Sequence, residues 1–441
     1  MGPLSRRDFA LATLSALTTA GCGAAATGTA EIKRGGGERS DGGRSGGGRS
    51  GTKGATGAPG ARAVTEMRGV WMATVENRDW PSRTGLSAAE QEKELIAHLD
   101  RAVRDRLNTV ILQVRPTADA LWPSPYEPWS QFLTGTQGRD PGWDPLGTAV
   151  REAHARGLQL HAWFNPYRIA NHTDPGLLTP AHPARVHPDW AVPYGGKLYY
   201  NPGLPAVRAF VQRAMLDAVA RYPVDAVHFD DYFYPYPEDG AAFADDEAYE
   251  RYRGAFTSRA DWRRDNIDRL VREMAAGIKR VRPGTRFGIS PFGVWRNAST
   301  DPRGSDTDAG AQTYDDLYAD TRTWVRENWI DYIAPQLYWE IGASGADYGT
   351  LLDWWAGVAE GSGTRLYIGE ALYRAGAAGA DGRPEAWQDP AELSRHLTLA
   401  ARRPQVGGHI FFAAGDVAND PIGAMRRVVA DHYTRPASPP R

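Results

Sequence analysis

Two adjacent carboxylates, Asp230 and Asp231, end an otherwise apolar run, AVHFDDYFYP, that has the composition of a buried β-strand. Adjacent strand residues face opposite ways, so His228 shares a side with Asp230. Two desolvated charges side by side are costly, which favours a functional purpose for the pair. Both are candidate catalytic residues. We expect Asp230 to face a cavity and Asp231 to hold the adjoining loop or an arginine, unless a bend at the strand end brings both inward.

Further polar and aromatic side chains stand where other β-rich runs end. Polar residues that share parity on a strand indicate a hydrogen-bonding pocket rather than a helix-facing surface. Glu340 is a third candidate catalytic carboxylate. The candidate substrate-binding residues are Arg115, Asp119, Trp163, Asn165, Tyr167, Arg168, His228, Tyr232, Gln336 and Tyr338.

Carboxylates accompanied by Trp, Tyr, Arg and Asn favour glycoside hydrolysis. That reaction needs one protonated carboxyl as acid and one ionised carboxyl as nucleophile or base, and aromatic platforms bind the sugar rings. We expect Arg168 to keep Asp230 ionised. Parity ranks three candidates for its protonated partner, in the order Glu340, Asp119 and Glu370. We also expect the aromatic rings of Trp163 and Tyr338 to line the sugar cleft.

Each of these residues also has a purely structural interpretation. Asp119 could cap a turn, and Arg115 and Arg168 could be ion-pair partners of the aspartates. Glu340 and Glu370 could be solvated or salt-bridged loop residues. His161 and His228 would then be ordinary histidines of a protein core.

Eight short β-rich runs alternate with amphipathic stretches along most of the chain. Apolar residues at helical spacing, such as Ile267, Leu270 and Met274, indicate helices between the runs. Eight βα units predict a (β/α)8 TIM barrel with enlarged strand-to-helix loops. The runs begin at Arg68, Thr109, Leu158, Val224, Thr285, Ile330, Arg365 and Gly407.

A doubly wound open sheet is the alternative to a barrel. It would usually carry a Gly-rich phosphate loop after its first strand, and RGVWMATVENRDW has none. In a barrel, functional residues gather at the C-terminal ends of the strands. The barrel prediction therefore places the candidate residues at one mouth.

The N-terminal part has a different composition. Residues 1–22 carry Arg6 and Arg7 before a short apolar stretch, the pattern of a twin-arginine export signal. Cys22 stands where a lipoprotein signal is cleaved and acylated; a plain cleaved signal with an incidental cysteine is the alternative. Residues 23–63 are rich in Gly, Ser and Arg and predict a disordered tether. We expect the barrel over 64–434 and a disordered tail over 435–441.

Composition excludes several classes of protein. The net charge of −2 argues against nucleic acid as a partner. A single cysteine excludes a disulfide framework and multi-thiolate zinc sites. Outside the Gly-rich segment over 23–63, the chain has no HxH pair, GxSxG elbow or GxxxxGK[ST] loop, so we expect no metal and no cofactor.

At RGVWMAT, QVRPTADALW, HAWFNPYR, VHFDDYFYP and PQLYW the sequence resembles the glycosyl-hydrolase-like 10 family of bacterial envelope proteins. The resemblance runs from about Met67 to about Asp416 and implies a (β/α)8 barrel with glycosidase activity. Some members are implicated in cleaving peptidoglycan glycan strands whose stem peptides have been removed. Glu340 and Glu370 lie in parts of the pattern that vary. The shared strand-end positions are Arg115, Asp119, Asn165, Arg168, Asp230, Asp231, Gln336 and Tyr338.

We therefore expect an exported glycosidase that acts on an envelope polysaccharide and is anchored through Cys22 to the outer side of the cell membrane. A glycan-binding lipoprotein whose barrel no longer cleaves is the alternative, and an envelope scaffold is a third. The aspartate pair favours the enzyme, since a binding barrel has no need of two desolvated carboxylates.

Overall fold

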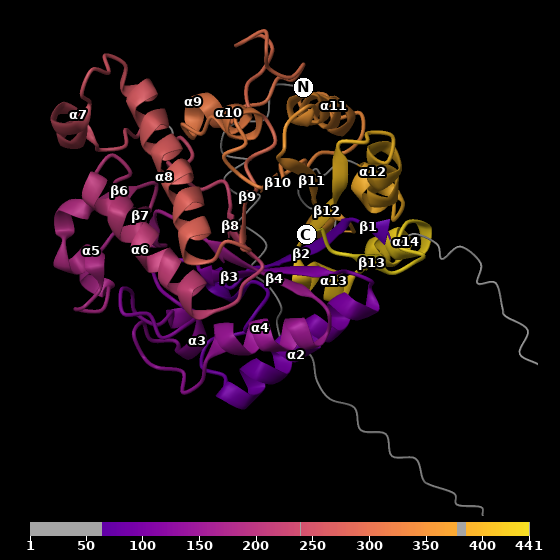
Figure 1. Cartoon of the computed structure of the whole chain (residues 1–441), viewed down its shortest axis with the longest axis horizontal. Coiled ribbons are helices and arrows are strands. Elements are labelled where there is room, and N and C mark those ends of the chain that lie inside the picture. The colour runs from indigo at the N-terminus through magenta and orange to yellow at the C-terminus, as the bar shows by residue number, and fades with distance from the viewer. Residues whose placement is uncertain (1–63, 239, 377–384, 441) are drawn as a thin grey trace, which may run out of the picture. The chain divides into compact units, whose positions relative to one another are not determined.

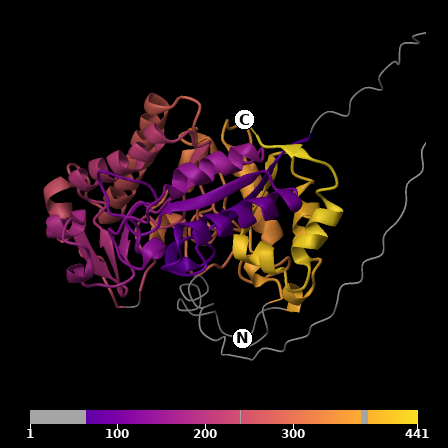
Figure 2. The same cartoon turned by 90° about the horizontal axis from the view of Figure 1, so that it is seen from below.

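The fold is a closed barrel of eight parallel strands in a computed structural model that describes residues 64–238, 240–376 and 385–440. The strands pair in the order β10-β11-β12-β2-β3-β4-β8-β9, and Figures 1 and 2 show the helices around the outside. The predicted (β/α)8 barrel is confirmed. Its strands are β2 (Met67–Met72), β3 (Thr109–Arg115), β4 (Gln159–Phe164), β8 (Ala226–Phe229), β9 (Arg286–Ile289), β10 (Tyr332–Ile333), β11 (Arg365–Glu370) and β12 (Val406–Phe412).

Several outer helices begin at a residue whose side chain caps the first turn. The Ser87 side chain accepts the Glu90 N–H in a capping box, and Asp144 accepts the Gly147 N–H at 2.9 Å. The main helices are α2 (Ala88–Arg104), α4 (Pro145–Ala155), α6 (Pro205–Arg221), α8 (Arg259–Val281), α10 (Thr321–Arg326), α11 (Tyr348–Ala359), α12 (Glu392–Ala400) and α14 (Ala424–Asp431). Within the described ranges, no helix has the length and apolarity that crossing a bilayer requires.

The connections that follow the strands are long and carry structure of their own. Between β4 and α6 lies an antiparallel sheet in the order β5-β7-β6, formed by β5 (Arg168–Ala170), β6 (Ala191–Tyr194) and β7 (Lys197–Tyr200). Between β8 and α8 lies the short helix α7 (Asp246–Tyr252). These insertions extend the C-terminal face of the barrel, where the candidate residues lie.

The two ends of the described chain pair with each other. Strand β1 (Val64–Thr65) runs parallel to β13 (Ala437–Ser438), and Arg68 donates to the Arg435 carbonyl at 2.8 Å. The C-terminal residues are thus held against the start of the barrel, where the sequence predicted a disordered tail over 435–441. The predicted export signal, Cys22 and the tether lie outside the described residues.

Histidine and aromatic side chains fill the centre of the barrel. Trp71 Nε1 donates to His228 Nε2 at 3.1 Å, and because an indole N–H can only donate, His228 must carry its proton on Nδ1. That nitrogen contacts the Tyr332 hydroxyl at 2.8 Å, and the same hydroxyl contacts His161 Nδ1 at 3.0 Å. Burial lowers the pKa of His228 to about 3, so the ring is neutral. Both ring nitrogens of His228 are used within the core, which leaves none for the substrate that the sequence assigned to it.

Candidate active site

Asp230 lies just beyond the end of β8 and faces the barrel mouth, as parity with His228 predicts. Its side chain is 5 % exposed. The amide Nδ2 of Asn165, which follows β4, donates to Asp230 Oδ2. The other oxygen, Oδ1, accepts the Tyr232 backbone N–H at 3.3 Å, and the Trp163 side chain also lowers the pKa of this carboxyl. One carboxylate oxygen is therefore tightly held, and the other is weakly bonded.

Asp231 also lies at the mouth, because the chain turns at the end of β8. Gln336 Nε2, beyond the end of β10, donates to Asp231 Oδ1 at 3.1 Å and also to the Ser290 carbonyl at 3.0 Å. The Tyr236 hydroxyl donates to Asp231 Oδ2. Both oxygens of Asp231 thus accept bonds from neutral donors, which favours its ionised form.

The electrostatics of the pair differ from the sequence prediction. Burial and the charge of Asp231 raise the pKa of Asp230 to about 7, although Arg168 lowers it. Burial also raises the pKa of Asp231, against the opposing hydrogen bonds from Tyr236 and Gln336. We expected Arg168 to keep Asp230 ionised; its guanidinium, which lies 5.2 Å from the centre of the Tyr232 ring, is outweighed by desolvation. Asp230 is therefore suited to hold a proton near neutral pH.

The orientation of Asn165 is fixed by Gln113, a residue that the sequence analysis did not assign to the site. The Gln113 Oε1 accepts the backbone N–H groups of Thr74 and Val75, both at 2.9 Å. Its Nε2 must therefore donate, and it does so to Asn165 Oδ1 at 2.5 Å. Asn165 is thereby left with only its N–H to present to Asp230. Gln113 and Arg115 share parity on β3, which was the available signal.

We expect Gln113→Glu to lower kcat by about 100-fold, the cost of a small misplacement of a reacting group. The introduced carboxylate can accept the two backbone N–H groups but cannot donate to Asn165. Asp230 would then lose its donor, and the alkaline limb of the pH–rate profile should move to higher pH. Gln91→Glu is the control. Gln91, in α2, is an equally buried amide whose Nε2 donates to the Leu86 carbonyl at 2.8 Å. An equal loss of activity in both variants would contradict the positioning role.

Arg115 and Asp119 are fully buried and paired with protein groups. Arg115 makes a two-bond ion pair with Glu127, Nε to Oε2 at 2.6 Å and Nη2 to Oε1 at 2.5 Å, and also donates to the Asn165 carbonyl. Asp119 accepts the Thr117 N–H at 2.9 Å and its hydroxyl at 3.0 Å. These contacts support the structural interpretation of both residues. Their assignment to substrate binding stays a prediction.

The aromatic candidates Trp163 and Tyr167 lie in different environments. Trp163 is 6 % exposed and packs in the barrel core beside Trp71 and Tyr332, so its loss would lower stability as well as binding. Tyr167 is fully buried, and the charges that act on its hydroxyl, Arg208 and Glu273, are on the outer helices α6 and α8. The described contacts of Tyr167 do not include the aspartates, and its assignment to substrate binding stays a prediction.

Tyr338 and Glu340 are half-buried residues that follow β10. The Tyr338 ring packs 5.7 Å from that of Tyr373 and 6.3 Å from that of Phe412, measured between centroids. Glu340 Oε2 accepts the indole N–H of Trp387 at 3.0 Å. This bond directs Glu340 toward the segment before α12, and its role as catalytic partner of Asp230 stays a prediction.

Glu370 lies outside the barrel interior, which removes it as the third choice for the acid. Its neighbour on the inward parity, Tyr367, packs in the barrel core, so Glu370 faces the helices. It accepts bonds from the Tyr348 hydroxyl at 2.8 Å and contacts Nδ1 of His396 and of His409, both at 2.9 Å. The two histidines lower the pKa of Glu370 to about 2, despite its complete burial. Parity alone could not tell which side of β11 faces inward.

We expect Glu370→Gln to lower the free energy of unfolding by roughly 2–4 kcal/mol at pH 7 and to leave kcat unchanged. The pKa of Glu370 is lower in the folded state than in the unfolded state. Its contribution to stability is therefore present above about pH 4.5 and lost as the pH falls toward 2. Denaturant unfolding at pH 7 and pH 3 tests this, and a variant whose deficit grows on acidification would contradict it.

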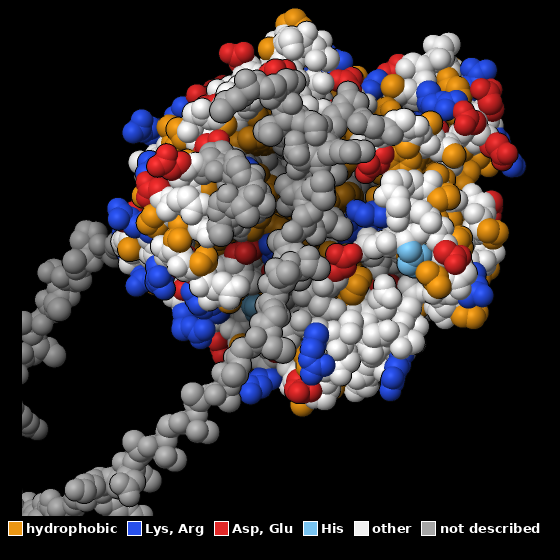
Figure 3. Space-filling view, turned by 180° about the vertical axis from the view of Figure 1, so that it is seen from behind, with side chains coloured by type: hydrophobic (Ala, Val, Ile, Leu, Met, Phe, Trp, Pro, Cys, Tyr) orange, Lys and Arg blue, Asp and Glu red, His pale blue; other side chains and the backbone are white. Residues whose placement is uncertain are grey.

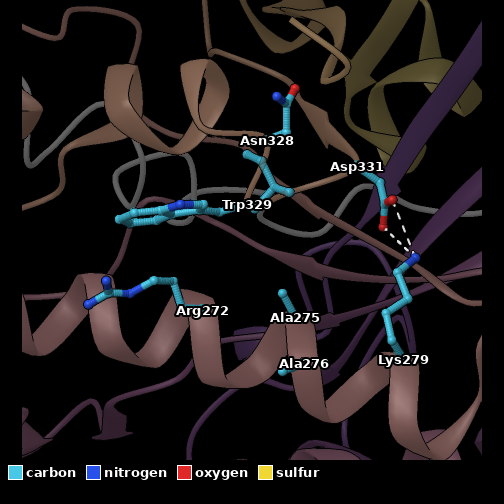
Figure 4. Close-up of a pocket in the computed structure, with 8 residues that line it drawn as sticks. Arg272, Ala275, Ala276, Lys279, Asn328, Trp329 and Asp331 are labelled. Carbon is cyan, nitrogen blue, oxygen red and sulfur yellow. Dashed lines mark hydrogen bonds and ion pairs between the residues drawn. The ribbon is translucent and has the colours of Figure 1, made fainter.

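The described surface pockets lie at the other end of the barrel. One of about 300 Å³ is formed by α8 and the segment before β10, where Lys279 Nζ binds Asp331 Oδ2 at 3.0 Å and the Arg272 guanidinium stacks on Trp329 (Figure 4). Another is formed by residues that precede β11 and β12. Both are at the N-terminal ends of strands, opposite the aspartates. On the described part of the face in Figure 3, acidic and basic side chains are interspersed, in keeping with the net charge of −2.

A (β/α)8 barrel with buried carboxylates at its C-terminal mouth has the architecture of barrel glycoside hydrolases. The model of the Glycosyl hydrolase-like 10 family matches residues 66–388, and the chain belongs to this family. It is similar to Glycosyl hydrolase YngK of Bacillus subtilis (strain 168), with 49% identity over 383 residues that cover 86% of this chain and 74% of the relative. It is also similar to Glycosyl hydrolase DigH of Escherichia coli (strain K12), with 44% identity over 374 residues, 80% of this chain and 84% of the relative.

Solved structures with the same architecture are more distant in sequence. The glycoside hydrolase domain of PgaB (BpsB) from Bordetella bronchiseptica aligns with a TM-score of 0.50 at 14% identity, over 82% of this chain and 98% of that chain. The catalytic domain of β-amylase from Paenibacillus polymyxa aligns with a TM-score of 0.52 at 10% identity, over 84% and 99%. At such identities these structures support the fold alone.

Proposed function

We propose that this protein is an exported glycoside hydrolase that cleaves O-glycosidic bonds of a cell-envelope polysaccharide by carboxylate catalysis. The observation that carries the proposal is the buried pair of Asp230 and Asp231 at the barrel mouth, each with a raised pKa and each held by polar partners. Strongly perturbed carboxyl groups at the catalytic end of a barrel are typical of acid–base sites. Membership of a family of glycosyl-hydrolase-like proteins supports the same class of reaction.

Peptidoglycan glycan strands without stem peptides are the substrate to test first, because the family resemblance points to them. Purified protein incubated with such strands should yield shorter saccharides, detected by mass spectrometry. Strands that keep their stem peptides serve as the comparison. Binding of the strands without any cleavage would overturn the proposal and favour the alternative, a non-catalytic glycan-binding lipoprotein.

We also propose that Cys22 anchors the mature protein to the outer side of the cell membrane. The proposal rests on a single cysteine that follows small residues after a paired arginine. Cys22→Ala should move the protein from the membrane fraction to the soluble exported fraction. Arg6→Lys with Arg7→Lys should block export by the twin-arginine route. Unchanged membrane retention of the Cys22 variant would contradict the lipid anchor.

A further inference from the structure

The site holds its two carboxyl groups side by side on one strand end, with different partners. Asp230 is held from the β4 side by Asn165, whereas Asp231 is held from the β10 side by Gln336. Both groups come from consecutive residues, so they approach a sugar bound at the mouth from the same strand end. Retaining and inverting glycosidases instead place two carboxyls on opposite sides of the scissile bond, about 5–5.5 Å or about 6.5–9.5 Å apart.

Within the described residues, the other carboxyl groups considered for the site have partners elsewhere. Asp119 is bonded to Thr117, and Glu370 lies between the barrel and its helices. Glu340 accepts the indole N–H of Trp387. These bonds occupy the three groups that could have supplied an opposing carboxylate nucleophile or an opposing base for water. A nucleophile that the sugar itself carries would meet the need.

We propose that the substrate is a 2-acetamido sugar whose own carbonyl oxygen is the nucleophile, with Asp230 as the general acid and Asp231 as the acceptor of the amide N–H. This proposal rests on the hydrolase function proposed above. Asp231 is suited to its role because both of its oxygens accept bonds from neutral donors, which favours its ionised form against the effect of burial. Asp230 is suited to act as the general acid because its Oδ1 is held by a long bond, from the Tyr232 N–H, and can present a proton.

The pKa values and one unpaired donor agree with these roles. Burial and the Asp231 charge raise the pKa of Asp230 to about 7, so a large fraction of the protein carries this proton at neutral pH. Trp163 lies beside Asp230, and its buried indole N–H meets no acceptor in acceptable geometry. A buried donor without a partner is costly, and a substrate oxygen at the mouth would satisfy it.

The reaction balances in two steps. First, the acetamido oxygen bonds to C1, the bond between C1 and the glycosidic oxygen breaks, and Asp230 gives its proton to the departing oxygen. The cyclic oxazolinium that forms keeps its N–H on Asp231. Second, a water oxygen bonds to C1, the bond between C1 and the acetamido oxygen breaks, and a water proton returns to Asp230. One water is added overall, and the anomeric configuration is retained.

The test compares one glycan in three forms, with an N-acetyl group, an N-trifluoroacetyl group or a hydroxyl at C2. An intramolecular nucleophile predicts a fall of at least about 100-fold from the acetyl to the trifluoroacetyl form and no cleavage of the hydroxyl form. A 2-deoxy-2-fluoro glycoside should leave no covalent sugar on the protein by mass spectrometry. Equal rates on all three forms, or a covalent adduct, would overturn this mechanism while the hydrolase function stands. Failure of the wild type to cleave any form would overturn both.

Aryl glycosides with activated leaving groups separate the two aspartates. The turnover rate of Asp230→Asn should fall by about 10²–10⁴-fold on substrates with a sugar leaving group. On substrates with an activated aryl leaving group, which needs no proton, it should fall by less than about 10-fold. The turnover rate of Asp231→Asn should fall on both kinds of substrate. Asp225→Asn, at the opposite end of β8, is the control and should match the wild type. The reverse pattern for Asp230 and Asp231 would overturn the assignment of roles.

Discussion

Replacing Asp230 by Asn is expected to lower turnover by about 10²–10⁴-fold on a glycan that the wild type cleaves, the usual contribution of a general acid. The substituted amide keeps the shape of the side chain and can still accept the Asn165 N–H, but it has no proton to give. Steady-state rates at saturating and limiting substrate measure the loss. Wild-type activity in this variant would make the assignment wrong, and Asp231 would become the candidate.

The same variant should not lose stability, which separates catalysis from folding. The folded pKa of Asp230 lies near 7, above its value in an unfolded chain. The folded state therefore binds more protons between about pH 4 and pH 7, and stability falls as the pH rises through that window. Asn cannot ionise, so it removes the cost of a buried charge at high pH. The melting temperature of the variant at pH 8.5 should therefore equal or exceed that of the wild type. Asp225→Asn, whose carboxylate binds His154 at 2.9 Å outside the site, controls for a generic effect of charge removal.

Replacing Glu127 by Gln is expected to lower the free energy of unfolding by about 3–5 kcal/mol, because it leaves the Arg115 guanidinium buried without its counter-ion. Both side chains are completely buried and joined by two hydrogen bonds. The Arg115 guanidinium also donates to the Asn165 carbonyl, so part of the activity of the folded protein should be lost with it. Chemical denaturation and the specific activity of the folded fraction measure the two effects.

Glu92→Gln is the matched control for this stability prediction. Glu92 pairs with Arg151 at 3.8 Å, and the two side chains are 43% and 60% exposed. An exposed pair of this kind contributes about 0–1 kcal/mol. A Glu127 variant no less stable than the Glu92 variant would show that the Arg115 charge is satisfied by backbone carbonyls alone.

Most of the fold could be predicted from the β-rich runs that recur along the sequence. Each of the eight β-rich runs overlaps one of the eight barrel strands, and parity placed Asp230 on the inner side with His228. The antiparallel sheet β5-β7-β6 could not be predicted in the same way, because its strands lie within one long connection. The pairing of β1 with β13 joins segments that are remote in sequence, and its two-residue strands give no pattern.

The site was predicted less completely, for physical reasons that particular residues show. Parity groups residues on one side of a strand but does not say which side is inside, which misplaced Glu370. Tyr167 follows the end of β4, where the alternation no longer holds. The direction in which the pKa of Asp230 shifts depends on its burial and on the charge of Asp231. Neither can be predicted from the spacing of residues in the sequence. The partner of Arg115, Glu127, lies in a loop with no periodic signal.

The most direct test of the central claim is digestion of glycan strands in water enriched in oxygen-18, with wild type and Asp230→Asn side by side. Hydrolysis at the barrel mouth predicts products that carry one heavy oxygen at each new reducing end in the wild type and almost none in the variant. Mass spectrometry reads both. Products without heavy oxygen, or equal amounts of labelled product from the two proteins, would contradict hydrolysis by this aspartate pair.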